Sequence, residues 1–304
     1  MSPNMRGALL LCIAMACFAL NDSLVKLALN TLTLGQIIFI RGLIATTLLV
    51  VFFHRSLDMK QLPLLRHPAS ILRIVAELMA SMLYLTSLIH LSIGFVTAIN
   101  QALPLFITAG AALFLMEPVG WRRWTAVSVG FIGVLIIVRP GLEGFSAWSL
   151  MTLSSVVFSA MRDLSTRRIP KEISSAALSI STAFSVAIFG GLIIEPMGGW
   201  QPISLQDGVV VTTAAAALVV GYHCLIMAMR EGEVSFIAPF RYTGLLWATL
   251  IGYLLFADIP DELTILGSAL VIGSGLYTLY RERRVSKTMP VMKSTGESMT
   301  PDGL

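Results

Sequence analysis

The stretch that decides the fold is residues 7–29, GALLLCIAMACFALNDSLVKLAL, in which Asp22 and Lys26 are the only charged residues. A hydrocarbon core about 30 Å thick is crossed by roughly 20 apolar residues in a helix that rises about 1.5 Å per residue. The stretch is long and apolar enough to be such a helix. Its two charges stand out, because an ionisable group inside a membrane costs about 2.5–3.5 kcal/mol on insertion scales and faces a cavity or a partner.

The rest of the chain repeats this pattern. Of its 304 residues, 56% are apolar and only 12% are charged, whereas soluble domains carry about 25% charged residues. This composition excludes a soluble enzyme and a nucleic-acid binder with a broad basic face. Lipid offers no partner to backbone polar groups, so the apolar runs are expected to be helices. The sequence predicts an all-α polytopic membrane protein with ten transmembrane helices, at 7–29, 34–53, 69–89, 94–116, 121–138, 146–166, 175–194, 208–229, 234–257 and 262–280.

Lysines and arginines predict how these helices are oriented. Alternate connections, beginning with the N-terminal segment, hold fifteen basic residues: Arg6, Arg55, Lys60, Arg66, Arg122, Arg123, Arg167, Arg168, Lys171, Arg230, Arg281, Arg283, Arg284, Lys287 and Lys293. The other set of connections holds only Arg139. Because basic loops stay on the cytoplasmic side, both termini are predicted to be cytoplasmic, which agrees with an even number of spans.

The chain also resembles itself when shifted by 141 residues. The shift brings together charged residues of like sign, Asp22 with Asp163, Lys26 with Arg167 and Glu117 with Asp258. It carries the first five spans onto the last five, and an odd number of spans turns the second copy upside down. Inverted repeats are common in alternating-access transporters, which bind substrate at the repeat interface. We expect two inverted five-helix repeats, at 1–140 and 141–281, and a disordered cytoplasmic tail at 282–304.

Several motifs point to a known family. They are FALNDSLVK at 18–26, IRG around Arg41, PLF and FLME within 104–117, APFRYT at 238–243 and GSGLY within 273–282. With these the chain resembles the drug/metabolite transporter superfamily, EamA type. The resemblance implies ten helices in two inverted EamA repeats and the export or uptake of small metabolites. It is greatest to exporters of aromatic and other neutral amino acids. One departure is Asp258, where second repeats usually carry Glu.

Ionisable residues inside the spans are the candidate substrate-binding or gating residues. Depth along each helix sorts them into two groups. On the outer side we expect an Asp22–Arg41 pair, and toward the cytoplasm a network of Glu77, Asp163, His223 and Arg241. The Asp163–Arg241 pair is interpreted as a gate. For Arg41 and Arg73 a permanent salt bridge between helices is an equal alternative, and for His223 a packing role is as plausible as proton coupling.

Polar and aromatic residues complete the candidate site. Pro104 and Pro239 interrupt the fourth and ninth spans, and interruptions in repeat-equivalent helices point to a transporter site. The amides of Asn100 and Gln101 in the fourth span are placed to bind polar groups of a substrate. Tyr84 and Trp247, with Phe18 and Phe106, would give an aromatic wall, although such residues more often serve ordinary packing.

No phosphate-binding loop, metal-ligand spacing or catalytic Ser/His/Asp arrangement is evident, so we expect no enzymatic activity, cofactor, metal or nucleic-acid partner. The sequence predicts a multi-pass secondary transporter of the bacterial inner membrane that exports small amphipathic metabolites, above all amino acids. One alternative is an importer of a larger metabolite such as S-adenosylmethionine or riboflavin. An alternative of another class is a polytopic membrane enzyme acting on lipids. Proton coupling and the choice between monomer and homodimer stay open.

Overall fold

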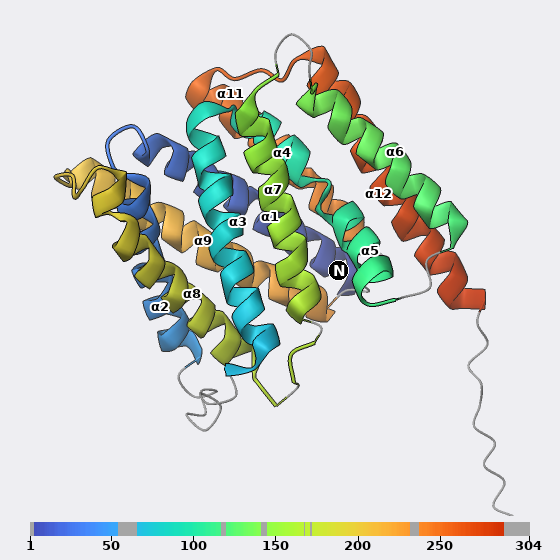
Figure 1. Ribbon diagram of the computed structural model, residues 1–304, viewed down its shortest axis with the longest axis horizontal. Coiled ribbons are helices and arrows are strands. Elements are labelled where there is room, and N and C mark those ends of the chain that lie inside the picture. The colour runs from blue at the N-terminus through green and yellow to red at the C-terminus, as the bar shows by residue number, and fades with distance from the viewer. Residues whose placement is uncertain are drawn as a thin grey trace, which may run out of the picture.

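The computed structural model describes residues 3–53, 66–116, 120–140, 145–166, 168–170, 172–231 and 237–288, and this described part is helical without strands. Its helices run back and forth between the two ends of one bundle (Figure 1). The α-helices are α1 Pro3–Ala28, α2 Leu34–Phe53, α3 Pro68–His90, α4 Ile93–Asn100, α5 Leu103–Phe114, α6 Trp121–Val138, α7 Ala147–Thr166, α8 Ser175–Ile193, α9 Leu205–Glu231, α11 Thr243–Phe256 and α12 Glu262–Thr288. Two 3₁₀ helices, η3 Glu195–Met197 and η4 Ala238–Tyr242, lie between them.

Helix length and composition fit a membrane. In the described part of the chain, five helical segments are long and apolar enough to cross one: Pro3–Ala28, Leu34–Phe52, Pro68–His90, Ile93–Phe114 and Leu205–Leu225. Three apolar segments, Trp124–Val138, Ala177–Ile193 and Glu262–Thr278, are shorter. The prediction of an all-helical bundle of apolar helices is confirmed.

The predicted fourth and ninth spans are each broken in two. α4 ends at Asn100 and α5 begins at Leu103, while η4 ends at Tyr242 and α11 begins at Thr243. The 141-residue shift carries Gln101 onto Tyr242, so the two breaks fall at matching positions. The prolines do not match, because Pro104 lies just after its break and Pro239 just before the other. A proline removes one backbone donor and crowds the preceding turn, so either placement interrupts a helix.

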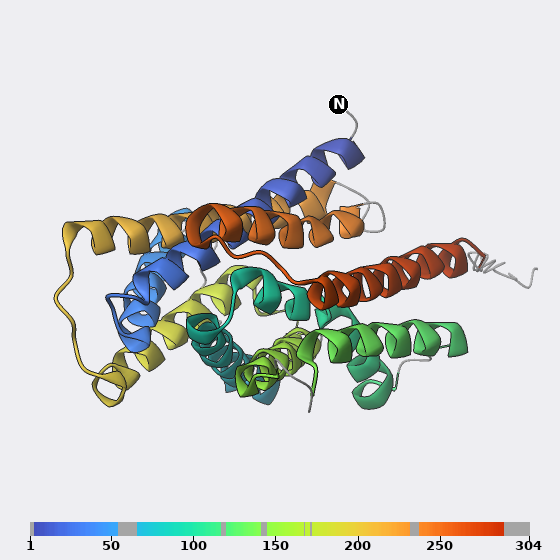
Figure 2. The same cartoon turned by 90° about the horizontal axis from the view of Figure 1, so that it is seen from above.

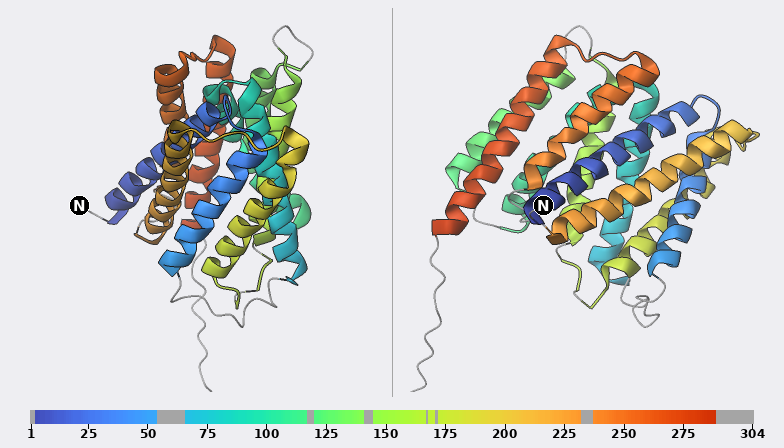
Figure 3. Two further views of the ribbon diagram at one scale, coloured as in Figure 1. Left: turned by 90° about the vertical axis from the view of Figure 1, so that its left-hand side faces the viewer. Right: turned by 180° about the vertical axis from the view of Figure 1, so that it is seen from behind.

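Seen from above, the helices form two layers (Figure 2). α1 packs along α9 and against α11, and we call these three helices the α1 layer. α3 packs along α7, which also contacts α5, and we call these the α3 layer. α2 packs on α8 at one side of the bundle and α6 on α12 at the other, and Figure 3 (right) shows the α1 layer between these two pairs.

Glycines allow the two helices of each flanking pair to approach until their backbones are in contact. A Cβ on Gly190 of α8 would lie 2.5 Å from the backbone nitrogen of Phe39 in α2. A Cβ on Gly133 of α6 would lie 2.7 Å from the carbonyl oxygen of Gly267 in α12. Such close approach is how membrane helices gain dispersion energy without a hydrophobic driving force between them. The flanking pairs therefore form a fixed frame around the two layers.

Candidate functional site

Two acids and one base pair between α3 and α7. Arg162 Nη1 donates to Glu77 Oε2 at 2.8 Å, and Arg162 Nε donates to Asp163 Oδ1 at 2.8 Å. Ser81, one turn beyond Glu77 on α3, donates to the other Glu77 oxygen at 3.4 Å. The three charged side chains are only 18–33% exposed. Pairing of this kind is what allows ionised groups to remain inside an apolar bundle.

A second acid, Asp22, is held by neutral donors. Tyr84 OH donates to Asp22 Oδ2 at 2.7 Å, and Asn21 Nδ2 donates to Asp22 Oδ1 at 2.8 Å. The predicted direct Asp22–Arg41 ion pair is not formed in the described structure. Arg41 Nη1 instead donates to Asn21 Oδ1 at 3.5 Å, so Asn21 bridges the two charges. The sequence analysis missed Asn21, although its position beside Asp22 in an apolar run was a usable signal.

Tyr222 of α9 interacts electrostatically with members of both groups, namely Arg41, Glu77, Arg162 and Arg73, and its ring packs edge-on against Phe18 with centroids 5.2 Å apart. Separate outer and inner groups were predicted, and the hydrogen bonds of the described residues form two sets. One holds Asp22, Asn21, Arg41 and Tyr84, and the other holds Glu77, Arg162 and Asp163. We call the two sets, together with Arg73 and Tyr222, the interior cluster: Asn21, Asp22, Arg41, Arg73, Glu77, Tyr84, Arg162, Asp163 and Tyr222.

His223 and Arg241 lie apart from this cluster. Both side chains are exposed, and neither has a hydrogen bond or ion pair to another residue of the described ranges. The predicted Asp163–Arg241 pair is therefore absent from this conformation, in which Asp163 pairs with Arg162.

Asn100 and Gln101 lie at the break between α4 and α5. Within the described part of the chain, neither side-chain amide has a hydrogen-bond partner. Gln101 faces the start of α11, since its Nε2 lies 3.7 Å from the place of a Cβ on Gly244. The two amides thus lie beside a helix break, and their role in substrate binding stays a prediction.

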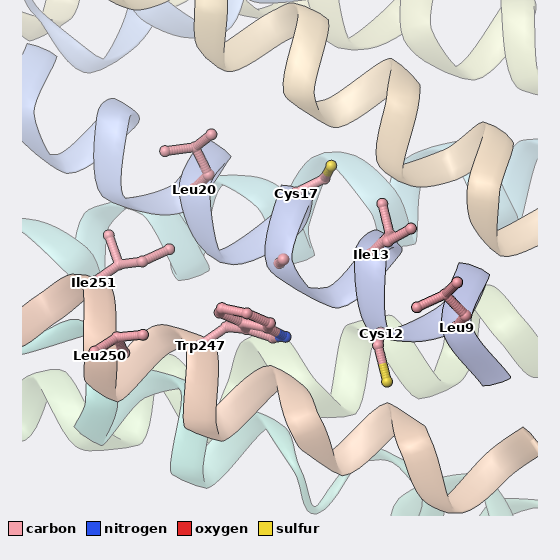
Figure 4. Close-up of a pocket in the computed structure, with 9 residues that line it drawn as sticks. Leu9, Cys12, Ile13, Cys17, Leu20, Trp247, Leu250 and Ile251 are labelled. Atoms are coloured by element: carbon pink, nitrogen blue, oxygen red, sulfur yellow. The ribbon is translucent and has the colours of Figure 1, made fainter.

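Trp247 lies elsewhere, in an apolar crevice between α1 and α11 (Figure 4). The crevice has a volume of about 400 Å³ and is lined by Leu9, Cys12, Ile13, Ala16, Cys17, Leu20, Trp247, Leu250 and Ile251. None of these residues carries a charge. Phe106 packs edge-on against Phe131 of α6, so it serves the core. Of the expected aromatic wall, Tyr84 and Phe18 lie at the interior cluster.

Two cations, Lys26 and Arg139, bind connecting segments at the end of the bundle where α1, α3, α6 and α11 end, which is the upper end in Figure 1. We call these contacts the clasp. Lys26 Nζ donates to the carbonyl oxygen of Leu91 at 2.6 Å and lies 3.6 Å from Asp258 Oδ2. Arg139, which ends α6, pairs with Asp261. Partial burial raises the pKa of Asp261, but hydrogen bonds from Thr264 and Arg139 outweigh it and hold the pKa below its usual value.

A polar pocket of about 310 Å³ lies beside this clasp. Its lining is His90, Leu91, Ser92, Phe95, Arg139, Ser146, Ile259, Pro260, Asp261 and Thr264. Arg167 and Glu117, the repeat counterparts of Lys26 and Asp258, lie outside the described residues, as does most of the predicted tail.

Comparison with known protein families gives a match to the first half of the chain. The profile of the EamA-like transporter family matches residues 5–139. The resemblance to EamA-type transporters seen in the sequence is thereby confirmed over the first half of the chain. Together with the apolar helices, this match indicates a multi-pass membrane protein.

Curated relatives of this chain are named for different substrates. An S-adenosylmethionine uptake transporter of Rickettsia felis is 26% identical over 191 residues, covering 62% of this chain and 63% of that protein. A riboflavin transporter of Vibrio cholerae is 27% identical over the same length. The chain thus spans just under two thirds of the length of these two. A pseudopaline exporter of Pseudomonas aeruginosa is 25% identical over 275 residues, covering 88% of this chain and 93% of the exporter.

A crystal structure of another protein shares the fold of this chain. It aligns with a TM-score of 0.64 at 14% sequence identity, covering 93% of this chain and 99% of that one. Similarity at this identity supports the fold alone. Among the described residues, no group of three or more His, Cys, Asp or Glu could hold a metal ion.

Proposed function

We propose that this protein is a secondary transporter of the bacterial inner membrane that exports amino acids and similar small amphipathic metabolites. The observation that carries the proposal is the interior cluster, which holds acids and bases together between two layers of apolar helices. Ionisable groups inside a membrane bundle mark substrate or ion pathways. A solute with both an ammonium and a carboxylate group would find a partner for each.

Alternating access through two inverted repeats, residues 1–140 and 141–281, is part of the proposal. The packing supports it: exchanging the repeats turns the α1–α9 pair into the α7–α3 pair. The α2–α8 and α6–α12 pairs are carried onto themselves, as helices beside a two-fold axis would be. The matching breaks after α4 and η4 add to this support. Such breaks in corresponding helices accompany midplane binding sites.

The distribution of basic residues supports cytoplasmic termini. The upper end of the bundle then faces outward, and the solute would cross from the lower end to the upper end. The interior cluster lies on this route, and Lys26 stands one helical turn above Asp22 toward the outside.

Uptake of a larger metabolite is a second candidate function. It is favoured by the relatives named for S-adenosylmethionine uptake and for riboflavin transport. No comparable observation favours an enzyme acting on lipids.

The test is flux into liposomes that contain the purified protein. Labelled phenylalanine, S-adenosylmethionine and riboflavin are offered separately, with and without an imposed pH gradient, and protein-free liposomes are the control. Protein-dependent flux of phenylalanine is expected, and its dependence on the gradient would establish proton coupling. Flux of S-adenosylmethionine or riboflavin without flux of any amino acid would replace the first candidate with the second.

A further inference from the structure

The polar pocket at the upper end of the bundle is assembled from four separate stretches of the chain. Residues 90–92 lie where α3 meets α4, Arg139 ends α6, Ser146 precedes α7, and residues 259–261 lie between α11 and α12. The first two stretches belong to the first proposed repeat and the other two to the second. The pocket volume of about 310 Å³ is at the small end of the range for ligand sites, roughly 300–1,000 Å³. It suits a solute of the size of a single amino acid.

The pocket adjoins the contacts that Lys26 makes at this end. Leu91 lines the pocket, and its carbonyl oxygen accepts the 2.6 Å hydrogen bond of Lys26. Asp258, 3.6 Å from Lys26 Nζ, directly precedes Ile259 of the lining. Lys26 in turn stands one helical turn above Asp22 of the interior cluster. A solute that crosses the bundle toward the upper end would therefore pass next to the pocket as it leaves.

One pair of opposite charges lines the pocket. Arg139 pairs with Asp261 through Nη2, while Arg139 Nε is buried without a hydrogen-bond partner in the described part of the chain. A guanidinium group carries five N–H donors, so this pairing leaves Arg139 with donors to spare. The side chain of Asp261 is 51% exposed. An ion pair that solvent reaches contributes little, so its members can take other partners at small cost.

Hydroxyl groups and an apolar surface complete the lining. Ser92 Oγ and Ser146 Oγ each accept from a backbone nitrogen, of Phe95 and Trp148, at 3.3 Å. Each hydroxyl group thus keeps its proton for another acceptor. The ring of His90 is stacked on Trp148, with centroids 3.7 Å apart and planes 13° from parallel. The apolar members of the lining are Leu91, Phe95, Ile259 and Pro260.

We propose that this pocket is a second binding site, which takes a zwitterionic amino acid at the upper end of the transport route. Arg139 binds the carboxylate, Asp261 binds the ammonium group, and the apolar lining receives the side chain. Both protein charges exchange their partner for a solute group of the same sign, so no charge is left unpaired. A solute with only one of the two charges would leave Arg139 or Asp261 without a partner, which is costly. The choice of solute rests on the proposed function.

The stack of His90 on Trp148 provides a readout that does not depend on transport. Because His90 lines the pocket, a bound solute should alter the fluorescence of Trp148. The chain has five tryptophans, so the Trp148 signal is the difference between the wild type and Trp148→Tyr, which keeps an aromatic ring beside His90. Both proteins are titrated in detergent with phenylalanine, with phenethylamine, which lacks the carboxylate, and with phenylpropionate, which lacks the ammonium group.

We expect a saturable change of the Trp148 signal with phenylalanine, at a concentration at least about tenfold lower than with either of the other solutes. Equal responses to the three solutes, or no response to phenylalanine, would overturn the inference. The comparison of the three solutes uses the same two proteins throughout, so a difference between the solutes cannot come from misfolding.

Variants then assign the charges to residues. Asp261→Asn should reduce the preference for phenylalanine over phenylpropionate to less than about threefold, and Arg139→Gln should do the same for the preference over phenethylamine. Glu262→Gln, at the next position along the chain but outside the lining, and Arg122→Gln, at the start of α6, are the matched controls and should change neither preference. An equal loss for all three solutes in both pocket variants would show a structural role for the pair and overturn the assignment.

Flux into liposomes separates this inference from the proposed function. A Trp148 response to phenylalanine without flux of any amino acid would retain the pocket and overturn amino-acid export. Flux of phenylalanine without a Trp148 response would do the reverse. Asp22→Asn, in the interior cluster, is expected to reduce flux and to leave the Trp148 response unchanged. Loss of the response in this variant would place the binding at the interior cluster and overturn the inference.

Discussion

The two ends of the bundle differ in how the helix layers are joined. At the upper end, one buried apolar cluster contains Val25 of α1, Leu88 of α3, Ile93 of α4 and Ala248 of α11, so it includes both layers. At the lower end, the buried cluster of Leu11, Ala14, Met15, Ala228 and Ile237 comes from α1, α9 and the residue before η4. Among its described members, this lower cluster includes nothing from α3 or α7.

The difference indicates which side of the interior cluster is closed. Apolar contacts between the layers seal the upper end, and Lys26 adds bonds to Leu91 and Asp258 above Asp22. Farther from that end, Tyr222 exposes 45% of its surface and Asp163 33% of its side chain. Under the proposed function, export would require the contacts at the upper end to break.

The ion pair within the interior cluster and the ion pair at the upper end therefore connect different parts of the bundle. Arg162 and Glu77 connect α3 with α7, which already pack along their lengths within one layer. Lys26 connects α1 with Leu91 at the end of α3, which belongs to the other layer, and with Asp258 at the end of α11, which belongs to its own layer. Loss of the first pair should therefore lower the stability of one layer, whereas loss of the second should shift the balance between open and closed upper ends.

The largest effect is expected from Arg162→Met. This change leaves Glu77 and Asp163 buried without their cation, and breaking a buried pair from one side costs about 3–5 kcal/mol. A fall of roughly 10 °C in the melting temperature of the detergent-solubilised protein should follow.

Arg122→Met is the matched control, because Arg122 lies over the exposed Trp121 ring at the start of α6, 5.2 Å from its centroid. It should change the melting temperature little, since exposed charges contribute about 0–1 kcal/mol. The triple variant R162M/E77Q/D163N should recover much of the lost stability. An unchanged melting temperature for Arg162→Met would show that this pair does not hold the α3 layer together.

An intermediate effect is expected from Lys26→Met, which removes the clasp but not the apolar seal. A hydrogen bond from a charged group contributes about 1.5–3 kcal/mol, so the population with an open upper end should rise about tenfold or more. Spin labels at Asn30 after α1 and at the exposed Ile89 near the end of α3, in a background without Cys12, Cys17 and Cys224, would report it as a longer distance by double electron–electron resonance.

Arg139→Gln is the control for this experiment. Its partner Asp261 precedes α12, and α6 and α12 already pack together as part of the frame, so the distance should stay unchanged. If Lys26→Met leaves the distance distribution as it is in the wild type, the clasp does not contribute to the seal.

Depth along a helix could be predicted from the sequence, whereas rotation about the helix axis could not. Depth along a helix is readable from residue numbers, since each residue adds about 1.5 Å. Depth predicts Asp22, Glu77, Tyr84 and Asp163 inside the membrane. The structure pairs Asp22 with Tyr84 and links Glu77 with Asp163 through Arg162. Rotation about the helix axis is not readable in a helix that is apolar all round. Tyr222 and His223 are neighbours in α9, yet only Tyr222 meets the cluster.

The sequence likewise could not predict which side chain each of these residues would contact. Asp163 was assigned to Arg241, but Arg162 beside it is the cation that turns toward both acids. Trp247 was assigned to the substrate cavity, but the packing of α11 on α1 turns it into an apolar crevice. Both differences come from how helices pack against one another. Charge and residue spacing along the sequence do not determine this packing.

The smallest effect concerns pH and tests whether the upper end contains a purely structural pair. Hydrogen bonds from Thr264 and Arg139 hold the pKa of Asp261 below its usual value. A carboxylate with a depressed folded-state pKa contributes stability fully above its unfolded pKa, about 3.9, and loses that contribution as pH falls through the folded pKa. The melting temperature of the wild type should therefore exceed that of Asp261→Asn at pH 7, and the gap should close as pH falls below about 4. The gap should be small, because the Asp261 side chain is 51% exposed and solvent screens its charge.

Arg139→Gln removes one of the two donors to Asp261, so it should reduce the pH dependence of the gap in melting temperature without abolishing it. A gap that widens as pH falls would mean that Asp261 is stabilised in its protonated form and that the Arg139 pair contributes nothing to holding the frame.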